Sequence, residues 1–522
     1  MTAVRTGVAW AIVVLSIAVS GSAQTAQAPL EETVRKIAEL LDVPDLTGAK
    51  AAADQALLAY PASAAVHNLA GVIDAQRGAF AAAESHFQRA IALAPRSPGA
   101  YENLGRLYQE RSAADPQARG KAVRTYESLL SIAPANTEGL YQLAFLHLLA
   151  GKFRESRALL DRLPPELQAR PQILAVRAAA LAGVGDPAAT ATLTTLEQHP
   201  DLTAADVLSI VPAFDHIKDP SALRRMLESL DRRNLATPEA LQALGRLDAR
   251  EGHYAESRAV LERAAASGVS VPLLLDLARA AYKAGDGNGA LGYLAHARAL
   301  EPKNANVHFL FGVVCVELNL AAEAFDALKK AVALDPENPQ INYVLGAVAT
   351  HRHDPSEAIP YFEKYVALLP DDPRGVFALG AAFFYSSQFD HAREQLQKVA
   401  ERKETAAGAH YYLARIARQS NDLDTARREV NMALQAYPKY ADAWAELGLI
   451  QTRTAEYAEA EQSLGKALAL DPNHYVANVN LATLYSRTKD SRREAQTARV
   501  NELQEKRAAQ AQEFLRMIQV EP

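Results

Sequence analysis

Residues 305–338 read ANVHFLFGVVCVELNLAAEAFDALKKAVALDPEN, and residues 339–372 read PQINYVLGAVATHRHDPSEAIPYFEKYVALLPDD. When residue 305 is counted as position 1, both stretches have glycine at position 8 and proline at position 32. Prolines elsewhere keep the same phase, namely Pro302, Pro438 and Pro472. A repeat with a period of 34 residues therefore runs through the chain.

Residue size recurs inside the repeat. Position 8 is glycine at Gly71, Gly105, Gly245, Gly312, Gly346, Gly380 and Gly448. Position 20 is alanine at Ala83, Ala122, Ala290, Ala324, Ala358, Ala392, Ala426 and Ala460. Position 24 is large and apolar at Phe87, Tyr126, Leu160, Leu261, Leu294, Leu328, Phe362, Leu396 and Leu464. The pattern predicts small residues where two elements approach closely and large residues where they interlock.

These spacings predict two helices in each repeat. Positions 4, 7, 8 and 11 share one face of a first helix, and positions 20, 24 and 27 share one face of a second. A turn near position 15 joins them, and the proline at position 32 ends the second helix. One such pair cannot bury its apolar face alone, so neighbouring pairs are expected to stack. The sequence therefore predicts an all-α fold.

The pattern closely resembles the tetratricopeptide repeat, with Trp444 at position 4, where that family has tryptophan. The resemblance implies an α-solenoid, a right-handed superhelix of antiparallel helix pairs. Eleven repeats are recognisable, beginning at about residues 64, 98, 137, 238, 271, 305, 339, 373, 407, 441 and 475.

The repeats divide the chain into expected regions. Capping helices at 29–63 precede an N-terminal array at 64–164, and a C-terminal array at 238–490 precedes a capping helix at 491–522. Residues 165–237 lack the phase, so they form either degenerate helical repeats or a hinge. Five of their prolines break them into short helical pieces, namely Pro171, Pro187, Pro200, Pro212 and Pro220.

The first 23 residues are predicted to be a secretory signal peptide. Arg5 precedes an apolar run from Gly7 to Ser20, and small residues follow, with cleavage after residue 23 or as late as 28. A retained N-terminal anchor is the alternative, and it would be the chain's membrane contact. The expected location is periplasmic or secreted, in a bacterium. The lone Cys315 lies on an apolar helix face and is predicted to be a core residue.

Composition argues against several classes of protein. A hydrophobic share of 49% argues against a disordered chain, and a net charge of −6 argues against nucleic-acid binding. No phosphate-binding loop, zinc-protease motif or nucleophile elbow is present. His351 and His353 could form a metal pair, but no third ligand is near in sequence. We therefore expect no enzyme activity, no catalytic residues, no cofactor and no metal.

Binding residues are suggested by the resemblance, which implies that positions 2, 5, 9 and 12 of the first helix line a concave groove. Position 5 is aromatic in four successive repeats, and aromatic and arginine residues stand at neighbouring groove positions. The predicted groove residues are Arg279, Tyr282, Phe309, Tyr343, Phe377, Phe384, Tyr411, Arg415 and Arg418. Rings could stack on prolines, aromatic side chains or sugars, and guanidinium groups could hold acidic groups.

Two interpretations of the aromatic residues remain open, since position 5 could instead pack against the adjacent repeat. The family's lysine and asparagine clamp for a terminal carboxylate is absent from positions 5 and 9. The leading hypothesis is an exported scaffold that binds a protein or peptide partner in the groove, in envelope assembly or secretion. The alternative is a polysaccharide-handling protein that binds glycan chains.

Overall fold

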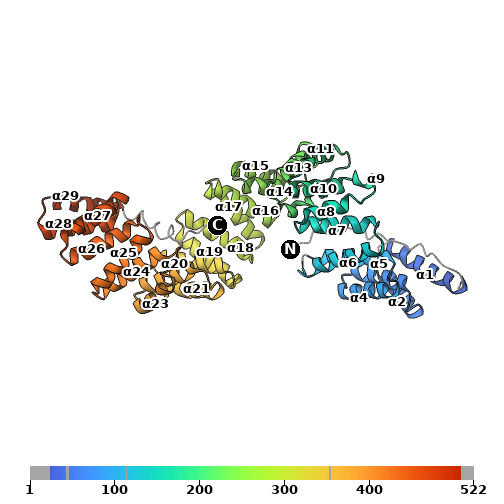
Figure 1. The fold of residues 1–522 in the computed structure, drawn as a ribbon, viewed down its shortest axis with the longest axis horizontal. Coiled ribbons are helices and arrows are strands. Elements are labelled where there is room, and N and C mark those ends of the chain that lie inside the picture. Colours follow the sequence, from blue (N-terminus) through green and yellow to red (C-terminus); the bar gives the residue numbers. More distant parts are fainter. Residues whose placement is uncertain (1–23, 43–45, 113, 352–353, 507–522) are drawn as a thin grey trace. The chain divides into compact units, whose positions relative to one another are not determined.

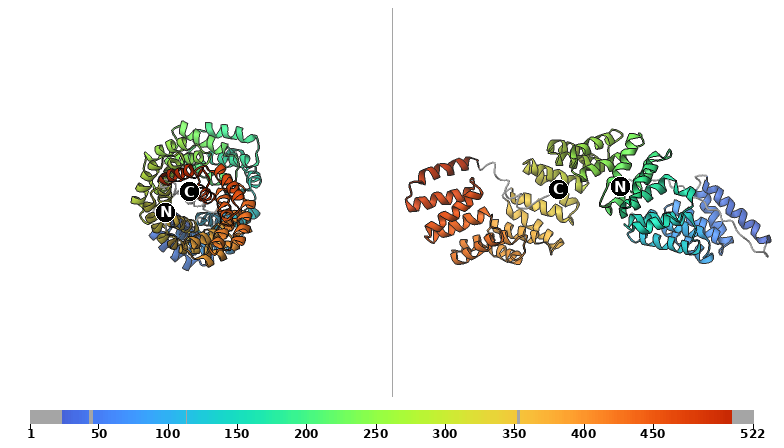
Figure 2. Two further views of the ribbon diagram at one scale, coloured as in Figure 1. Left: turned by 90° about the vertical axis from the view of Figure 1, so that its left-hand side faces the viewer. Right: turned by 45° about the horizontal axis from the view of Figure 1, so that its top comes forward.

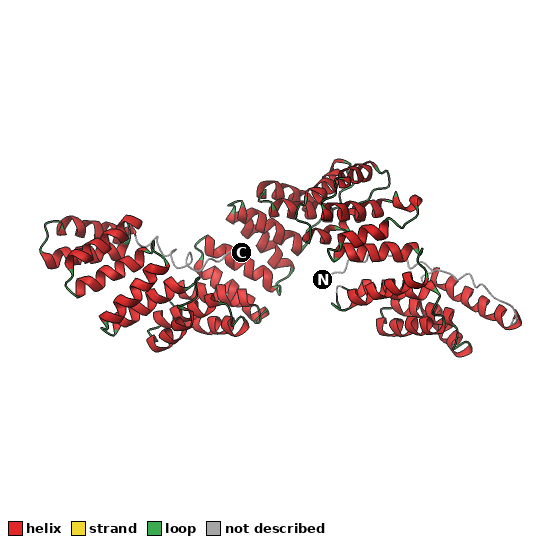
Figure 3. Cartoon of the chain, in the orientation of Figure 1, coloured by secondary structure: helices red, strands yellow, loops and turns green. Residues whose placement is uncertain are grey.

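The computed structural model describes residues 24–42, 46–112, 114–351 and 354–506. Over these ranges the chain forms 29 α-helices and one 3-10 helix, with no β-strand (Figures 1 and 3). The all-α prediction is therefore confirmed. The predicted signal peptide and the end of the predicted C-terminal cap, residues 507–522, lie outside the described ranges. None of the described helices has the length and apolar character needed to cross a membrane.

The chain divides into two units, residues 1–253 (unit 1) and 254–522 (unit 2). The helices of unit 1 are α1 (Gln24–Asp42), α2 (Leu46–Ala59), α3 (Ala64–Gln76), α4 (Phe80–Leu93), α5 (Pro98–Arg111), α6 (Ala118–Ile132), α7 (Thr137–Leu149), α8 (Phe153–Leu160), α9 (Pro165–Gln168), α10 (Pro171–Val184), α11 (Ala188–Gln198), α12 (Ala204–Leu208), the 3-10 helix η1 (Val211–Asp215), α13 (Ser221–Arg232) and α14 (Pro238–Arg250).

The helices of unit 2 are α15 (Tyr254–Ala265), α16 (Val271–Lys283), α17 (Gly287–Leu300), α18 (Ala305–Glu317), α19 (Ala321–Leu334), α20 (Pro339–His351), α21 (Pro355–Leu368), α22 (Pro373–Tyr385), α23 (Phe389–Val399), α24 (Ala406–Gln419), α25 (Leu423–Ala436), α26 (Ala441–Arg453), α27 (Tyr457–Leu470), α28 (Tyr475–Thr488) and α29 (Arg493–Lys506).

Within each unit, consecutive helices pack as pairs. The closest associations in unit 1 include α3 with α4 and α5 with α6, and those in unit 2 run from α16 with α17 to α26 with α27. Figure 2 shows these pairs from two further directions. The first helices of successive repeats also touch, as α18, α20, α22, α24 and α26 do in turn. The predicted solenoid of helix pairs is therefore confirmed.

Glycine at position 8 allows the two helices of a repeat to interlock. A Cβ atom built on Gly105 would lie 2.5 Å from the ring of Tyr126, and one built on Gly346 would lie 2.8 Å from the ring of Phe362. Both rings are fully buried. The ring at position 24 therefore occupies the space that a side chain at position 8 would need.

Position 4 has a role that the residue pattern did not reveal. In six repeats, this side chain hydrogen-bonds the carbonyl of the residue six positions earlier, which is the proline that precedes the repeat. Histidine, tyrosine, asparagine and tryptophan all make this bond, with distances from 2.9 Å for Trp444 to 3.3 Å for Asn478. The bond satisfies a carbonyl just beyond the end of the preceding second helix. The six residues are His67, Tyr101, His308, Asn342, Trp444 and Asn478.

The middle of unit 1 is helical, and its prolines mostly begin helices. Pro171 is the first residue of α10, Pro187 is the N-cap of α11 and Pro220 is the N-cap of α13. Proline suits the start of a helix because the first N–H groups of a helix have no intrahelical acceptor, so the N–H that proline lacks is not needed there. The helices α10 and α11 pack together as a pair of ordinary length.

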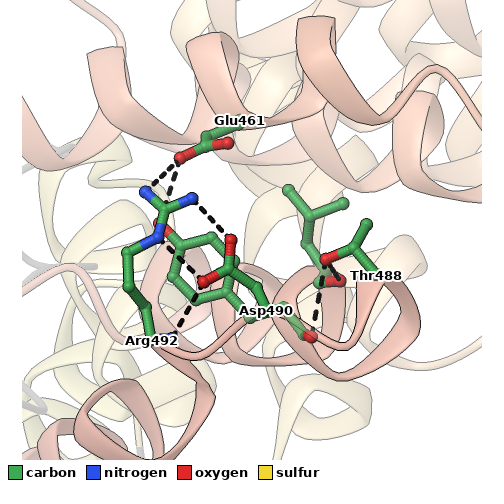
Figure 4. A network of polar contacts seen from close by, with 6 residues as sticks. Glu461, Thr488, Asp490 and Arg492 are labelled. Atoms are coloured by element: carbon green, nitrogen blue, oxygen red, sulfur yellow. Dashed lines mark hydrogen bonds and ion pairs between the residues drawn. The ribbon is translucent and has the colours of Figure 1, made fainter.

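A polar network joins the last three helices of unit 2 (Figure 4). The Arg492 guanidinium forms ion pairs with Glu461 of α27 and with Asp490, at 2.6 and 2.7 Å. It also lies over the ring of Tyr485, 4.3 Å from the ring centroid, while the Tyr485 hydroxyl donates to Glu461. Leu503 of α29 is buried. The network therefore fixes the connection from which α29 covers α28.

Cys315 is buried in the core of unit 2, as predicted. Burial raises the pKa of its thiol to about 11. The thiolate, which is the reactive form, is therefore scarce at neutral pH.

Candidate functional site

The candidate site lies on the first helices of unit 2. We call the side that carries positions 5, 9 and 12 of α16, α18, α20, α22 and α24 the first-helix face. Because successive first helices touch and the repeat period is constant, equivalent positions form rows across this face. The position-5 row contains Phe309, Tyr343, Phe377 and Tyr411.

All four aromatic residues of this row are partly buried and pack against the core. The ring of Tyr343 lies 4.9 Å from that of Tyr365 and 5.8 Å, edge-on, from that of Phe362. Burial raises the pKa of Tyr343 well above its ordinary value, so its hydroxyl stays protonated at neutral pH. These four residues therefore support the solenoid, and each keeps some surface accessible to solvent.

The end of the row contacts the next repeat. The ring of Phe377 packs directly against Gly408 of α24, and a Cβ atom built on Gly408 would lie only 2.7 Å from this ring. Tyr411 packs against Tyr440, the N-cap of α26, with ring centroids 5.1 Å apart. These contacts fit the packing interpretation of position 5, and they coexist with the partial exposure that binding requires.

The three predicted arginines have different environments. Arg279 is 51% exposed and lies 3.6 Å from Asp276 on its own helix. Arg418 hydrogen-bonds Glu446 of α26, a carboxylate that is buried. Two of the three guanidinium groups therefore already have a carboxylate partner.

Arg415 differs from both, because its neighbours are aromatic rings. Its guanidinium carbon lies 4.5 Å from the ring centroid of Phe384, 5.4 Å from that of Tyr411 and 5.7 Å from that of Tyr412. Phe384 is only 6% exposed and so lies beneath Arg415, where it supports the guanidinium rather than offering a contact surface. Among the described residues, Arg415 has no hydrogen-bond or ion-pair partner.

Tyr282 stands apart from the aromatic row. It lines a shallow pocket with Lys283, Val314 and Glu317. The Lys283 ammonium lies 5.9 Å from the centre of its ring. Burial, reinforced by the Glu317 carboxylate, raises the pKa of Tyr282 to about 12. The pocket is therefore polar at its rim and separate from the Arg415 cluster.

Three residues of this region were not predicted from sequence. The hydroxyl groups of Tyr385 and Tyr412 form a hydrogen bond of 3.1 Å, and the ring of Tyr440 packs on that of Tyr411. They occupy positions 13, 6 and 34, which the resemblance does not assign to the groove. Together with Tyr411 they make four tyrosines, at spacings of 26, 1 and 28 residues. This was the only sequence signal for the cluster, and its spacing does not follow the repeat.

The first helices of unit 1 carry a different set of side chains. Asn103 donates to Asn68 at 3.0 Å, and Asn136 donates to Glu102 at 2.7 Å. Arg106 donates to Glu138 at 3.1 Å. These polar groups link successive repeats to one another and leave their hydrogen-bonding capacity largely used.

No cluster of three or more histidine, cysteine, aspartate or glutamate side chains in the described part of the chain is placed to hold a metal ion. Of the possible histidine pair, His351 ends α20, whereas residues 352–353 lie outside the description.

Solved structures that resemble the chain share modest sequence identity with it. Yeast Tom70 is 17% identical, with 87% of this chain and 95% of that chain covered and a TM-score of 0.36. A tetratricopeptide repeat protein from Parabacteroides merdae is 15% identical, with 47% and 98% covered and a TM-score of 0.39. The MamA protein is 23% identical, with 33% and 94% covered and a TM-score of 0.30. Comparison with curated protein sequences gives no match.

Family models give a direct assignment. Models described as tetratricopeptide repeat match residues 39–98, 113–180, 275–339, 326–373, 377–441 and 441–474, which is more than half of the chain. The first match extends into the segment that was predicted as an N-terminal cap. The chain therefore belongs to the tetratricopeptide repeat family, whose members are typically non-catalytic scaffolds that bind protein partners.

Proposed function

We propose that the chain is an exported scaffold that holds a protein or peptide partner on the first-helix face of unit 2, in envelope assembly or secretion. The observation that supports this most is the row formed by Phe309, Tyr343, Phe377 and Tyr411, in which every residue packs against the core and is only partly buried. Export rests on the sequence of the first 28 residues, which predicts a periplasmic or secreted location.

The physical basis is preorganised aromatic anchoring. A ring that is already held by its neighbours loses little conformational entropy when a partner covers its exposed part. Large aromatic side chains of this kind, together with arginine, dominate the energetics of protein interfaces. Contacts with Tyr365 and Phe362 hold Tyr343, and contacts with Gly408 and Tyr412 hold Phe377. No covalent step is required.

The test compares the natural mature protein with three variants in affinity capture from envelope extract. In the first variant, the four residues of the row are replaced by alanine, and in the second they are replaced by leucine, which keeps most of the buried volume. The matched control is Tyr457→Ala, which removes an aromatic side chain that is 39% exposed on the second helix α27. Circular dichroism melts establish that each variant is folded, and captured partners are re-measured in purified form by calorimetry.

The outcomes separate the two partner classes. We expect the alanine variant to lose at least 10-fold in affinity while the control is unchanged. Retention of binding by the leucine variant indicates a peptide that recognises apolar surface. Loss by the leucine variant as well indicates that planar rings are needed, as for stacking on the sugars of a glycan chain. Equal affinity of all forms would show that the row serves packing alone.

A further inference from the structure

The Arg415 guanidinium lies among aromatic rings, and Glu446, a carboxylate whose charge favours the charged form of Arg415, is hydrogen-bonded to Arg418 instead. The Arg415 guanidinium is flanked by the rings of Phe384, Tyr411 and Tyr412, and within the described ranges no acceptor lies at hydrogen-bond distance. Stacking on rings satisfies the faces of a guanidinium but leaves its N–H groups without acceptors. The side chain is therefore held in place with its hydrogen-bonding edge unused.

A second donor without an acceptor stands beside the same ring. The Tyr440 hydroxyl is buried and has no hydrogen-bond partner among the described residues. The Tyr440 ring packs on Tyr411, whose other contacts include the Arg415 guanidinium. Burial keeps the pKa of Tyr440 well above its ordinary value, so the hydroxyl remains a donor at neutral pH. Two donors in one cluster without acceptors indicate that an acceptor is missing.

We propose that this cluster, which we call the Arg415 site (Phe384, Tyr385, Tyr411, Tyr412, Arg415 and Tyr440), binds a carboxylate of the partner peptide. The inference rests on the proposed function, since it assigns the chemistry of one part of the same face. The carboxylate belongs either to an aspartate or glutamate side chain or to a peptide C-terminus. The rings around the guanidinium favour an apolar or aromatic residue next to the carboxylate in the peptide.

The local charge favours a carboxylate over a phosphate group. Arg415 and Arg418 contribute two positive charges, while Glu446, which Arg418 hydrogen-bonds, and Asp442, whose charge acts on Tyr411 and Tyr440, contribute two negative charges. The local charge is therefore balanced, which suits a singly charged carboxylate held by the free edge of Arg415 better than a group with two negative charges. Binding of a phosphate group commonly uses several arginines, because the group carries close to two negative charges. Arg279 is no substitute for Arg415, since it is exposed and already lies near Asp276.

The test uses defined peptides with the mature full-length protein. The first pair is Ac-Ala-Phe-Asp-Phe-Ala-NH2 and its Asn analogue, which differ in one carboxylate. The second pair is Ac-Ala-Phe-Phe with a free C-terminal carboxyl group and with a C-terminal amide. Affinities are measured by calorimetry for the natural protein, for Arg415→Met, which keeps the bulk of the side chain without its charge, and for the control Arg428→Met, at an exposed arginine on the second helix α25.

We expect at least one carboxylate peptide to bind the natural protein about 10-fold more tightly than its amide partner. The pair that shows the preference identifies the source of the carboxylate. Arg415→Met should reduce the preference to less than about 2-fold, whereas Arg428→Met should leave it unchanged. Arg415→Lys, which keeps the charge but loses the planar fork, should retain part of it. Melting curves establish that the variants remain folded.

Three results would overturn the inference, and they are distinguishable. Equal affinity for both members of each pair, with both lost in the four-alanine variant of the aromatic row, would refute the carboxylate site and leave the proposed face intact. Absence of binding by every peptide to the natural protein would refute the peptide-binding function together with the site. A preference that persists in Arg415→Met would assign the carboxylate to another residue.

Discussion

The first helices of unit 1 and unit 2 use equivalent positions in opposite ways. In unit 1, Asn68, Glu102 and Asn103 form hydrogen bonds that join one repeat to the next. In unit 2, position 5 is aromatic in the four repeats that begin at residues 305, 339, 373 and 407, and Arg415 lies beside the last of these rings without a hydrogen-bond acceptor among the described residues. A polar row that pairs with itself contributes to stability and offers little to a partner, whereas a row with exposed rings and unused donors is suited to binding.

The comparison assumes that glycine at position 8 packs against the large residue at position 24 in both units. Substitution of this glycine tests the assumption, and it should change the free energy of unfolding more than most of the other substitutions below. Gly105→Ala in unit 1 and Gly346→Ala in unit 2 place a methyl group against the buried rings of Tyr126 and Phe362. Each should destabilise the protein by about 2 kcal/mol, because neither ring can move without disturbing its packing. Chemical denaturation measures both.

The control for these substitutions is Gly465→Ala. Gly465 is exposed within α27, and nothing lies within 4 Å of a Cβ atom built there. Alanine should stabilise this helix by about 0.5–1 kcal/mol, since it restricts the unfolded chain and meets no neighbour. A similar loss at Gly465 and Gly105 would contradict the interlock.

The polar row of unit 1 provides the next test. Asn103→Leu removes the donor to Asn68 and leaves a buried amide oxygen without a partner. Stability should fall by about 1–3 kcal/mol, while the affinity for peptides at unit 2 should not change. Asn431→Leu, on the exposed side of α25, should alter stability by less than about 0.5 kcal/mol. Loss of peptide affinity in Asn103→Leu would show that unit 1 takes part in binding.

The hydrogen bond made by position 4 is common to both units, so its loss should cost a similar amount in each. Tyr101→Phe removes only the hydroxyl that donates to Pro95, and Trp444→Phe removes the indole N–H that donates to Pro438. Each should lower the free energy of unfolding by about 1 kcal/mol. Tyr437→Phe, whose side chain is 52% exposed, is the control and should have no measurable effect. A large difference between the two losses of stability would show that the hydrogen bond from position 4 stabilises only one of the two units.

The smallest expected effect is the loss of one ion pair at low pH. The pair involves Asp372, which accepts a hydrogen bond from Tyr365, the tyrosine that packs on Tyr343 of the aromatic row. Hydrogen bonds from Arg374, and also from Tyr365, lower the pKa of Asp372 to about 2. Because the pKa is lower in the folded state than the ordinary value of about 3.9, the stabilisation is present above about pH 4 and is lost as pH falls through about 2. Asp372→Asn should therefore melt lower than the natural protein at pH 5, and the difference should shrink at pH 2.5.

Asp390→Asn is the control for this titration, because the Asp390 side chain is 94% exposed in its ion pair with Arg393. Surface pairs of this kind contribute little to stability. Its melting temperature should follow that of the natural protein at both pH values. A gap between Asp372→Asn and the natural protein that stays constant with pH would contradict the titration argument.

The repeat pattern predicted most of the fold because the interlock depends on side-chain size at fixed spacing. Helices begin at Ala64, Pro98 and Thr137 in unit 1 and at Val271, Ala305 and Pro339 in unit 2, which are the starts expected from the period. The role of position 4 escaped prediction because four chemically different residues make the same bond. No periodic signal marks a function that histidine, tyrosine, asparagine and tryptophan share.

The candidate site was predictable only in part. The period placed Phe309, Tyr343, Phe377 and Tyr411 in one row, but it could not show how much of each ring is packed. Nor could it tell that Arg418 pairs with Glu446 while Arg415 lies among rings, because this depends on side chains 28 residues apart and on rotamers. The groove assignments, the export signal and the partner class remain predictions.

The hydrogen bond from position 4 to the preceding proline has an evolutionary consequence. Its donor and acceptor are six residues apart, so each bond is self-contained at one junction between repeats. Duplication or deletion of the gene segment for one 34-residue repeat would leave each remaining bond of this kind with both its donor and its acceptor. An array built in this way can gain or lose repeats without any change in contacts elsewhere in the chain. Substitutions on its exposed rows can then change what it binds.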